Sequence, residues 1–266
     1  MNFKAKKNLA RLALCFAVAS GSSANTNTAI IFVHGAHFNA NAWQLVQTKL
    51  NNQIPSYAVN LPGRNDNILA KKISLELSAA SLCSFLATIP NEKMIVAHSQ
   101  GGAVVNASLS ICPEETVRKV VYLSAVAPLN GDGVFSKLNK TDETHYFSGV
   151  HYNEQEQLME ISNPTNFANS FAQDATPEQK TWLLANAFSE PAFIGEGKVA
   201  LNRQRFDSIE KYYIFAKQDQ IISLESQQNI ANDLNLKGSF EIDSGHLPML
   251  TNSQELTNLL VKIREI

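Results

Sequence analysis

Short apolar segments alternate with longer amphipathic segments along most of the chain. Six of the short segments are rich in Val, Ile, Tyr and Phe, and they are mostly apolar throughout rather than apolar at every second position. That pattern is typical of strands buried on both faces of a parallel sheet. The predicted strands are AIIFV (29–33), YAVN (57–60), MIVA (94–97), KVVYLS (119–124), YYIFA (212–216) and SFEI (239–242).

Helical patterns fall between these predicted strands. In segment 73–89, for example, Leu75, Leu82 and Leu86 gather on one side of a helix. Alternation of strand and helix favours the α/β class, with a mostly parallel six-stranded sheet, right-handed crossovers and helices on both faces. The clearest helical segments are 40–50, 73–89, 100–111, 224–234 and 253–263.

One long interval, from about residue 128 to residue 206, interrupts this alternation. It contains no strand pattern, and its helical signals include DATPEQKTWLLANAF (174–188). Asp174 or Thr176 suits the N-cap of that helix, with Pro177 in its first turn. Because the interval is too long for a plain crossover, we expect an inserted, mostly helical cap over one end of the sheet.

The first 24 residues have the three-part layout of a secretory signal peptide: a basic start, the apolar run LALCFAVAS and the small residues GSSA. The apolar run is too short to span a membrane, and bulky Leu14 disfavours a lipoprotein site at Cys15. We expect cleavage after Ala24 and a mature domain of residues 25–266. The mature protein would then be periplasmic or secreted.

Composition narrows the function classes. The 266-residue chain has a net charge of −2, and residues 1–24 carry four basic and no acidic residues, so the remainder carries −6. That charge does not suggest nucleic acid or an anionic membrane as a partner. Cys83 and Cys112 remain after cleavage, and pairing and two free thiols stay open alternatives. The cysteine spacing matches no metal motif. The sequence leaves open whether the protein is a monomer or a homodimer.

The segment Ala97-His98-Ser99-Gln100-Gly101 follows a predicted strand and precedes a predicted helix. A sharp turn at this place presents a serine hydroxyl openly, and small neighbours are needed because strand and helix pass close together. Alanine stands where the motif usually begins with glycine. The pattern predicts that Ser99 is a nucleophile that needs a nearby base.

The expected partners of Ser99 follow it in the order acid, then histidine. Asp219 comes after the strand YYIFA, and His246 comes after the strand SFEI and a Ser-Gly turn. We predict His246 as the general base and acid and Asp219 as the group that orients it. Other residues fit this order less well because of their place along the chain: His98, His145, His151, Asp207 and Asp243.

An acyl-transfer site also needs two backbone N–H groups that face the developing negative charge. Gln100, directly after the nucleophile, is the first expected donor. The loop after the first strand, within FVHGAHF (32–38), offers Ala36 as the second. No metal or other cofactor is expected in this chemistry.

These motifs resemble the α/β-hydrolase group that contains plant methylesterases, hydroxynitrile lyases and related bacterial esterases. The similar segments run from about Ile30 to the C-terminus: FVHGAHFNANAW, VAHSQGG, DATPEQ, YIFAKQDQII and GHLPML. The resemblance implies a six-stranded core sheet. It also implies Ser99, Asp219 and His246 as the triad and Ala36 and Gln100 as oxyanion donors. Phe38 and Asn39 depart from the His-Gly of the plant members.

Together these features predict a serine hydrolase that cleaves a small-molecule carboxylic ester through an acyl-enzyme. The alternatives are cyanohydrin cleavage by the same triad and a non-catalytic binding protein that kept the fold. The resemblance implies that lyases place a lysine directly after the catalytic histidine and a threonine after the first histidine of the oxyanion loop. This chain has Leu247 and Gly35 there, which favours the esterase and makes Leu247 an expected substrate contact.

Overall fold

The computed structural model of the protein describes residues 28–64, 67–113 and 116–266. The predicted signal peptide, residues 1–24, lies outside the described residues. No helix in the described part of the chain is both long enough and apolar enough to cross a membrane.

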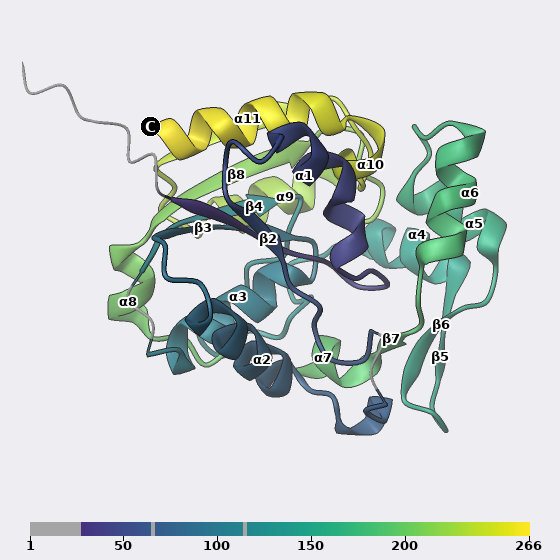
Figure 1. Ribbon diagram of the computed structural model, residues 1–266. Coiled ribbons are helices and arrows are strands. Elements are labelled where there is room, and N and C mark those ends of the chain that lie inside the picture. Colours follow the sequence, from purple (N-terminus) through teal and green to yellow (C-terminus); the bar gives the residue numbers. More distant parts are fainter. Residues whose placement is uncertain (1–27, 65–66, 114–115) are drawn as a thin grey trace, which may run out of the picture.

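A six-stranded sheet forms the centre of the molecule, and every pair of neighbouring strands in it is parallel (Figure 1). The central strands are almost wholly buried, whereas the outermost strands are partly exposed. This arrangement explains the apolar character of the predicted strands and confirms the fold class. In spatial order the strands are β2 (Ser56–Ala58), β1 (Ala29–Val33), β3 (Lys93–His98), β4 (Val117–Leu123), β8 (Glu210–Ala216) and β9 (Gly238–Ile242).

Helices cover both faces of the sheet (Figure 1). α1 (Gln44–Leu50) and α11 (Ser253–Glu265) pack together on one face, and α2 (Leu75–Ala87) and α3 (Gly101–Ile111) pack together on the other. Trp43, just before α1, is fully buried and stacks on Phe32 of β1. The remaining elements of the body are η1 (Ala40–Trp43), η2 (Ala70–Lys72), α9 (Leu224–Ala231) and α10 (Pro248–Thr251).

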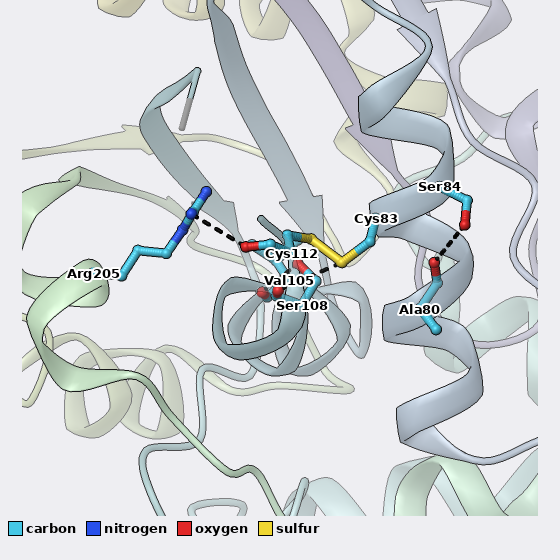
Figure 2. The surroundings of a disulfide bond; sticks show 7 residues. All are labelled: Ala80, Cys83, Ser84, Val105, Ser108, Cys112 and Arg205. Carbon is cyan, nitrogen blue, oxygen red and sulfur yellow. Dashed lines mark hydrogen bonds between the residues drawn. A yellow bond between two sulfur atoms is a disulfide. The ribbon is translucent and has the colours of Figure 1, made fainter. Parts of the chain in front are cut away.

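A disulfide joins α2 to the end of α3. Cys83 and Cys112 are bonded sulfur to sulfur at 2.00 Å, and Figure 2 shows the bond crossing between the two helices. The guanidinium of Arg205 donates to the backbone carbonyl of Cys112 at 3.3 Å. The sequence left open whether these two cysteines form a disulfide or remain free thiols, and the structure has the disulfide.

The middle part of the segment between β4 and β8 projects beyond the carboxyl ends of the strands (Figure 1). We use the name cap for residues 139–191 of this segment. The cap comprises α4 (Lys140–Gly149), β5 (Val150–Asn153), β6 (Leu158–Ile161), α5 (Pro164–Phe171), α6 (Pro177–Asn186) and β7 (Glu190–Pro191). After it, α7 (Ala192–Glu196) and α8 (Arg203–Ser208) return to the body and pack on α2 and α3.

The cap contains helices, but it also contains strands, although the sequence shows no strand pattern between residues 128 and 206. β5, β6 and β7 form a three-stranded antiparallel sheet. His151 and Tyr152 of β5 are exposed and none of the four residues of β6 is fully buried, so these strands lack the apolar run that identifies a buried strand. Thr176, by contrast, caps α6 as one of the two predicted candidates, in a capping box with Gln179.

Candidate active site

Ser99 occupies the sharp turn between β3 and α3. Its φ of 53° lies in the left-handed region, where a non-glycine residue is strained. The backbones around it approach so closely that a Cβ on Gly101 would lie 2.6 Å from the carbonyl oxygen of His34, and one on Gly102 would overlap the carbonyl of Val126. The small residues around Ser99 are therefore required by the packing of strand, helix and neighbouring loops.

The structure brings Ser99, His246 and Asp219 into one hydrogen-bonded chain. The Nε2 atom of His246 lies 3.0 Å from Ser99 Oγ, and its Nδ1 atom lies 2.7 Å from Asp219 Oδ2. These residues come from the carboxyl ends of β3, β9 and β8, which meet at the edge of the sheet under the cap. All three side chains are buried.

The surroundings of Asp219 define the tautomer of His246. Because a carboxylate only accepts, the Nδ1 atom of His246 carries the proton, and Nε2 is left to accept from the Ser99 hydroxyl. Asp219 Oδ1 accepts from the backbone N–H groups of Ile221 and Ile222 at 2.7 and 3.0 Å. The hydroxyl of Ser124 also donates to Asp219 Oδ2. Several fixed donors thus hold the carboxylate in place toward the imidazole.

His98, beside the nucleophile, has a different place. It is fully buried, and its Nε2 donates to the backbone carbonyl of His246 at 2.8 Å. Burial, together with the nearby His246, lowers the pKa of His98 well below its ordinary value, so the ring stays neutral. The His98 side chain therefore stabilises the segment that carries His246. Within the described residues it makes no hydrogen bond to the hydroxyl of Ser99. The other rival residues hydrogen-bond or pair elsewhere: His145, His151, Asp207 and Asp243.

Two backbone N–H groups remain available beside Ser99. Within the described residues, neither the N–H of Ala36 nor that of Gln100 donates to a protein acceptor. Ala36 follows β1 and borders the same cavity as Ser99, and Gln100 is the N-cap of α3, whose N-terminus favours negative charge. The arrangement can accommodate an oxyanion between the two loops.

His34 holds the loop that carries Ala36. Its Nδ1 donates to the carbonyl of Gly35 at 2.9 Å, and its Nε2 accepts from the backbone N–H of Leu61 at 3.2 Å. Burial, helped by the positive charge of Arg64, lowers the pKa of His34 from 6.5 to about 3. The neutral ring therefore ties the end of β1 to the segment after β2.

A cavity of about 150 Å³ opens beside Ser99. Its wall is mainly apolar and aromatic, which suits an apolar part of a small substrate. Leu247 is buried in the hydrophobic core and is not among the described residues that line this cavity, so its contact with substrate stays a prediction. The apolar wall comprises Ala36, Phe135, Leu138, Tyr146, Phe147, Phe171, Ile221 and Ile222.

A larger and more open cavity, of about 620 Å³, lies elsewhere, between the segment 68–73 and the β5–β6 hairpin. Its described lining includes no residue of the hydrogen-bonded chain. We place the candidate site at the smaller cavity because it is lined by Ser99, which is hydrogen-bonded to His246, and by Ala36.

Sequence reasoning missed several residues that shape this site. Ser124 directly follows β4, but nothing in its local sequence indicates that it reaches Asp219. His37 and Glu190 link the oxyanion loop to the cap over 153 positions, with no local pattern to announce the contact.

Comparisons with known proteins identify the family of the chain. The sequence profile described as the alpha/beta hydrolase family matches residues 30–259. Methylesterase 7 of Arabidopsis thaliana is 24% identical over 256 residues, which cover 91% of this chain and 98% of that protein. Polyneuridine aldehyde esterase of Rauvolfia serpentina is 21% identical over 264 residues, with 92% and 99% of the two chains covered.

Solved structures have the same fold. An extracellular α/β-hydrolase from a Paenibacillus species, described as sharing structural and functional homology with tobacco salicylic acid binding protein 2, superimposes with a TM-score of 0.76 at 19% identity, covering 88% of this chain and 98% of that one. A pyrethroid hydrolase from Sphingobium faniae JZ-2 gives 0.76 at 18% identity, covering 89% and 97%. The resemblance to the plant methylesterases is thus confirmed, and the chain belongs to the alpha/beta hydrolase family.

Proposed function

We propose that the protein is a serine hydrolase that cleaves a small carboxylic ester through an acyl-enzyme on Ser99. The observation that carries this proposal is the hydrogen-bonded chain from Ser99 Oγ to His246 Nε2 at 3.0 Å and from His246 Nδ1 to Asp219 at 2.7 Å. Esterase names among the relatives, including Methylesterase 7 and polyneuridine aldehyde esterase, support the same reaction class.

In the acylation step, Ser99 Oγ attacks the ester carbonyl carbon while His246 Nε2 takes the hydroxyl proton. The carbonyl oxygen becomes negatively charged and accepts hydrogen bonds from the N–H groups of Ala36 and Gln100. Asp219 stabilises the imidazolium that forms. When the tetrahedral intermediate collapses, the bond to the alcohol oxygen breaks, and that oxygen takes the proton from His246 Nε2.

In the deacylation step, water replaces the alcohol. His246 removes a proton from the water, whose oxygen attacks the acyl carbon, and the same two N–H groups receive the second oxyanion. Collapse returns the proton to Ser99 Oγ and releases the carboxylic acid. Because His246 must be neutral to act as base, kcat/KM is expected to fall in acid.

The shape of the oxyanion loop supports ester cleavage over cyanohydrin cleavage. A Cβ at Gly35 would lie 2.6 Å from Ser99 Cβ and 3.0 Å from His98 Nδ1, so a threonine there would displace the nucleophile. Leu247 adds no positive charge that would stabilise a departing cyanide. The mainly apolar cavity wall supports an ester with an apolar acyl or alcohol group.

We also propose that the protein acts after export, in the periplasm or outside the cell. The three-part layout of residues 1–24 and the Cys83–Cys112 disulfide support this localisation, since disulfides persist in oxidising compartments. Mass spectrometry of exported protein would test it, with a chain that begins near Asn25 as the expected result. An intact Met1 or a lipid on Cys15 would contradict it.

The proposed reaction is tested with p-nitrophenyl and alkyl esters of varied acyl and alcohol length, assayed beside mandelonitrile on one preparation. We expect ester turnover that is lost in Ser99→Ala, and no cyanide release above background. Cyanide release that depends on Ser99, without ester turnover, would overturn the proposal.

A further inference from the structure

One carboxylate of the cap reaches both loops that form the oxyanion site. Glu190 of β7 is only 2% exposed, although it belongs to a segment far from β1 and β3 in the chain. Its Oε2 atom accepts from the backbone N–H of His37 at 2.9 Å, and its Oε1 atom accepts from the side-chain amide of Gln100 at 2.7 Å. One oxygen thus faces the loop of Ala36, and the other faces the turn of Ser99.

The charge of Glu190 is balanced inside the protein. Arg64, 1% exposed, donates from its guanidinium to Glu190 Oε2 and to the carbonyls of Pro62 at 2.7 Å and Phe38 at 3.3 Å. A buried carboxylate without such a partner would be strongly destabilised. Arg64 therefore allows Glu190 to stay charged and keep both of its oxygens as acceptors.

His37 is fixed to the cap at four points. Its backbone carbonyl accepts from the N–H of Phe188 at 2.9 Å, its backbone N–H donates to Glu190, and its Nδ1 donates to the carbonyl of Phe188 at 2.8 Å. Its Nε2 therefore accepts from the hydroxyl of Tyr146 at 2.9 Å. Burial lowers the pKa of His37 and raises that of Tyr146, so the ring is neutral and the phenol keeps its proton. These bonds hold His37 at a φ of 66°, in the left-handed region.

These contacts restrain the two expected oxyanion donors. The N–H of His37 belongs to the peptide that follows Ala36, so its bond to Glu190 limits rotation of Ala36 about its Cα–C bond. The side-chain bond of Gln100 limits movement of the first residue before α3. Because an oxyanion hole works through donors that are already in place, small displacements of either loop reduce its effect.

We propose that Glu190, with Arg64 as its counter-ion, is a positioning residue that sets the two oxyanion donors from the cap. The cap is then required for the chemical step as well as for shaping the cavity. This inference rests on the proposed ester hydrolysis at Ser99.

The variant Glu190→Gln tests the inference because it keeps the shape and removes one acceptor. A glutamine has a single acceptor oxygen, so it cannot accept from both His37 and Gln100, and its own NH₂ would face one of those donors. The second variant, Gln100→Leu, keeps the backbone N–H of the oxyanion site and leaves the Glu190–Arg64 pair intact. If Glu190→Gln does not fold, the inference is tested with Gln100→Leu alone.

Lys211→Met is the matched control. Lys211 is equally buried, and its Nζ donates to the carbonyls of Phe206 and Ile209 at 2.7 Å each, near the start of β8 and away from the site. Its loss removes a buried charge and two hydrogen bonds, as a purely structural defect would. Active sites in every sample are counted by fluorophosphonate titration, so that kcat refers to folded, competent enzyme.

Glu190→Gln is expected to lower kcat per titrated site about 10- to 100-fold with KM changed less than about threefold, and Gln100→Leu about 3- to 10-fold. Lys211→Met is expected to lower the melting temperature while kcat stays within about twofold of wild type. A Glu190→Gln or, failing that, a Gln100→Leu enzyme with wild-type kcat would overturn the inference, and so would an equal loss in Lys211→Met. Absence of Ser99-dependent turnover in the wild type would instead contradict the proposed function and, with it, this inference.

Discussion

The body and the cap contribute different chemistry to the candidate site. The body supplies the groups that would react in the proposed mechanism, Ser99 and His246, together with Asp219, which orients His246; all three follow the carboxyl ends of parallel strands. The cap supplies aromatic walls and carboxylates that only accept hydrogen bonds. Ser99, His246 and Asp219 therefore lie at the ends of strands of the central sheet, and residues of the cap contact the loops around them.

Each loop that carries a functional group is contacted by an acidic residue of the cap. Glu190 holds the oxyanion loop and Gln100. Asp142 accepts from the N–H of Ser223 at 3.0 Å and the hydroxyl of Ser226 at 2.5 Å, shortly after Asp219. Asp174 accepts from the N–H of Gly245 at 2.9 Å, directly before His246. An insertion can thus hold the loops of a candidate site in place without contributing a reacting atom.

The largest loss of activity is expected from a substitution in the body. His246→Ala removes the base, and kcat should fall about 10⁶-fold, as when one member of a cooperating triad is lost. The melting temperature should fall as well, because the buried ring of His246 fills space and donates to Asp219, so kcat is measured on the folded fraction. Stopped assays on the best ester of the panel measure kcat. A His246→Ala enzyme that keeps more than about a tenth of its activity would show that the body does not supply the base.

The disulfide provides a test of body stability apart from chemistry. Replacing both Cys83 and Cys112 with serine opens a loop whose ends lie 29 positions apart, and the free energy of unfolding should fall by about 3–4 kcal/mol. Because the bond joins α2 and α3 away from the cavity, kcat/KM of the folded variant should match the wild type. Urea denaturation and ester assays measure the two quantities. A tenfold loss of kcat/KM in the folded variant would contradict the claim that the disulfide affects stability and not catalysis.

Acid should weaken the body through its buried histidines. The pKa of His34 is lowered in the folded state, so below about pH 6.5 the unfolded chain binds a proton that the native protein does not, and stability falls as pH falls until about pH 3. Between pH 7 and pH 5, His34 alone accounts for a loss of about 2 kcal/mol. His98 and His37, whose pKa values burial also lowers, add to the loss in the same direction.

Urea denaturation at pH 7, 6 and 5 measures this dependence. In His34→Gln, the slope of the free energy of unfolding against pH between 5 and 6 should decrease by about 1 kcal/mol per pH unit, close to the contribution of one proton. Stability that stays constant from pH 7 to pH 5 would show that these rings are not buried as described.

The smallest effect is expected at the exposed contact of the cap with the loop of His246. Asp174→Ala removes the acceptor for Gly245 and for the hydroxyl of Ser244, and kcat should fall about two- to fivefold with little change in melting temperature. Asp243→Ala is the control, since Asp243 is also exposed and near His246 but pairs with Gln218 and Lys217 of the body. Equal kcat values for the two variants would show that the contacts of Asp174 do not help to position His246.

The body could be predicted from the sequence because its signals are local. Burial on both faces of the sheet requires apolar residues throughout a strand, as in 29–33 and 94–97. The close approach of strand and helix requires small residues around Ser99. The triad order followed from where Asp219 and His246 stand after their strands. The cap could not be predicted in the same way, because its β5–β6 hairpin is partly exposed and lacks an apolar run.

Contacts between distant segments were equally hidden. Arg64 and Glu190 are 126 positions apart, and only the folded chain brings the two charges together. The disulfide likewise depends on the approach of α2 and α3, which cysteine spacing alone does not reveal. Local patterns therefore predicted the residues that form the hydrogen-bonded chain, and tertiary packing determined the residues that contact it.

The most direct test of the account is covalent labelling of the nucleophile. A histidine-activated serine that borders an open cavity should react with a fluorophosphonate, and the intact mass should increase by one adduct that peptide mapping places on Ser99. Ser99→Ala should gain no adduct under the same conditions. Equal labelling of the wild type and Ser99→Ala would contradict the central claim that Ser99 is the nucleophile of this site.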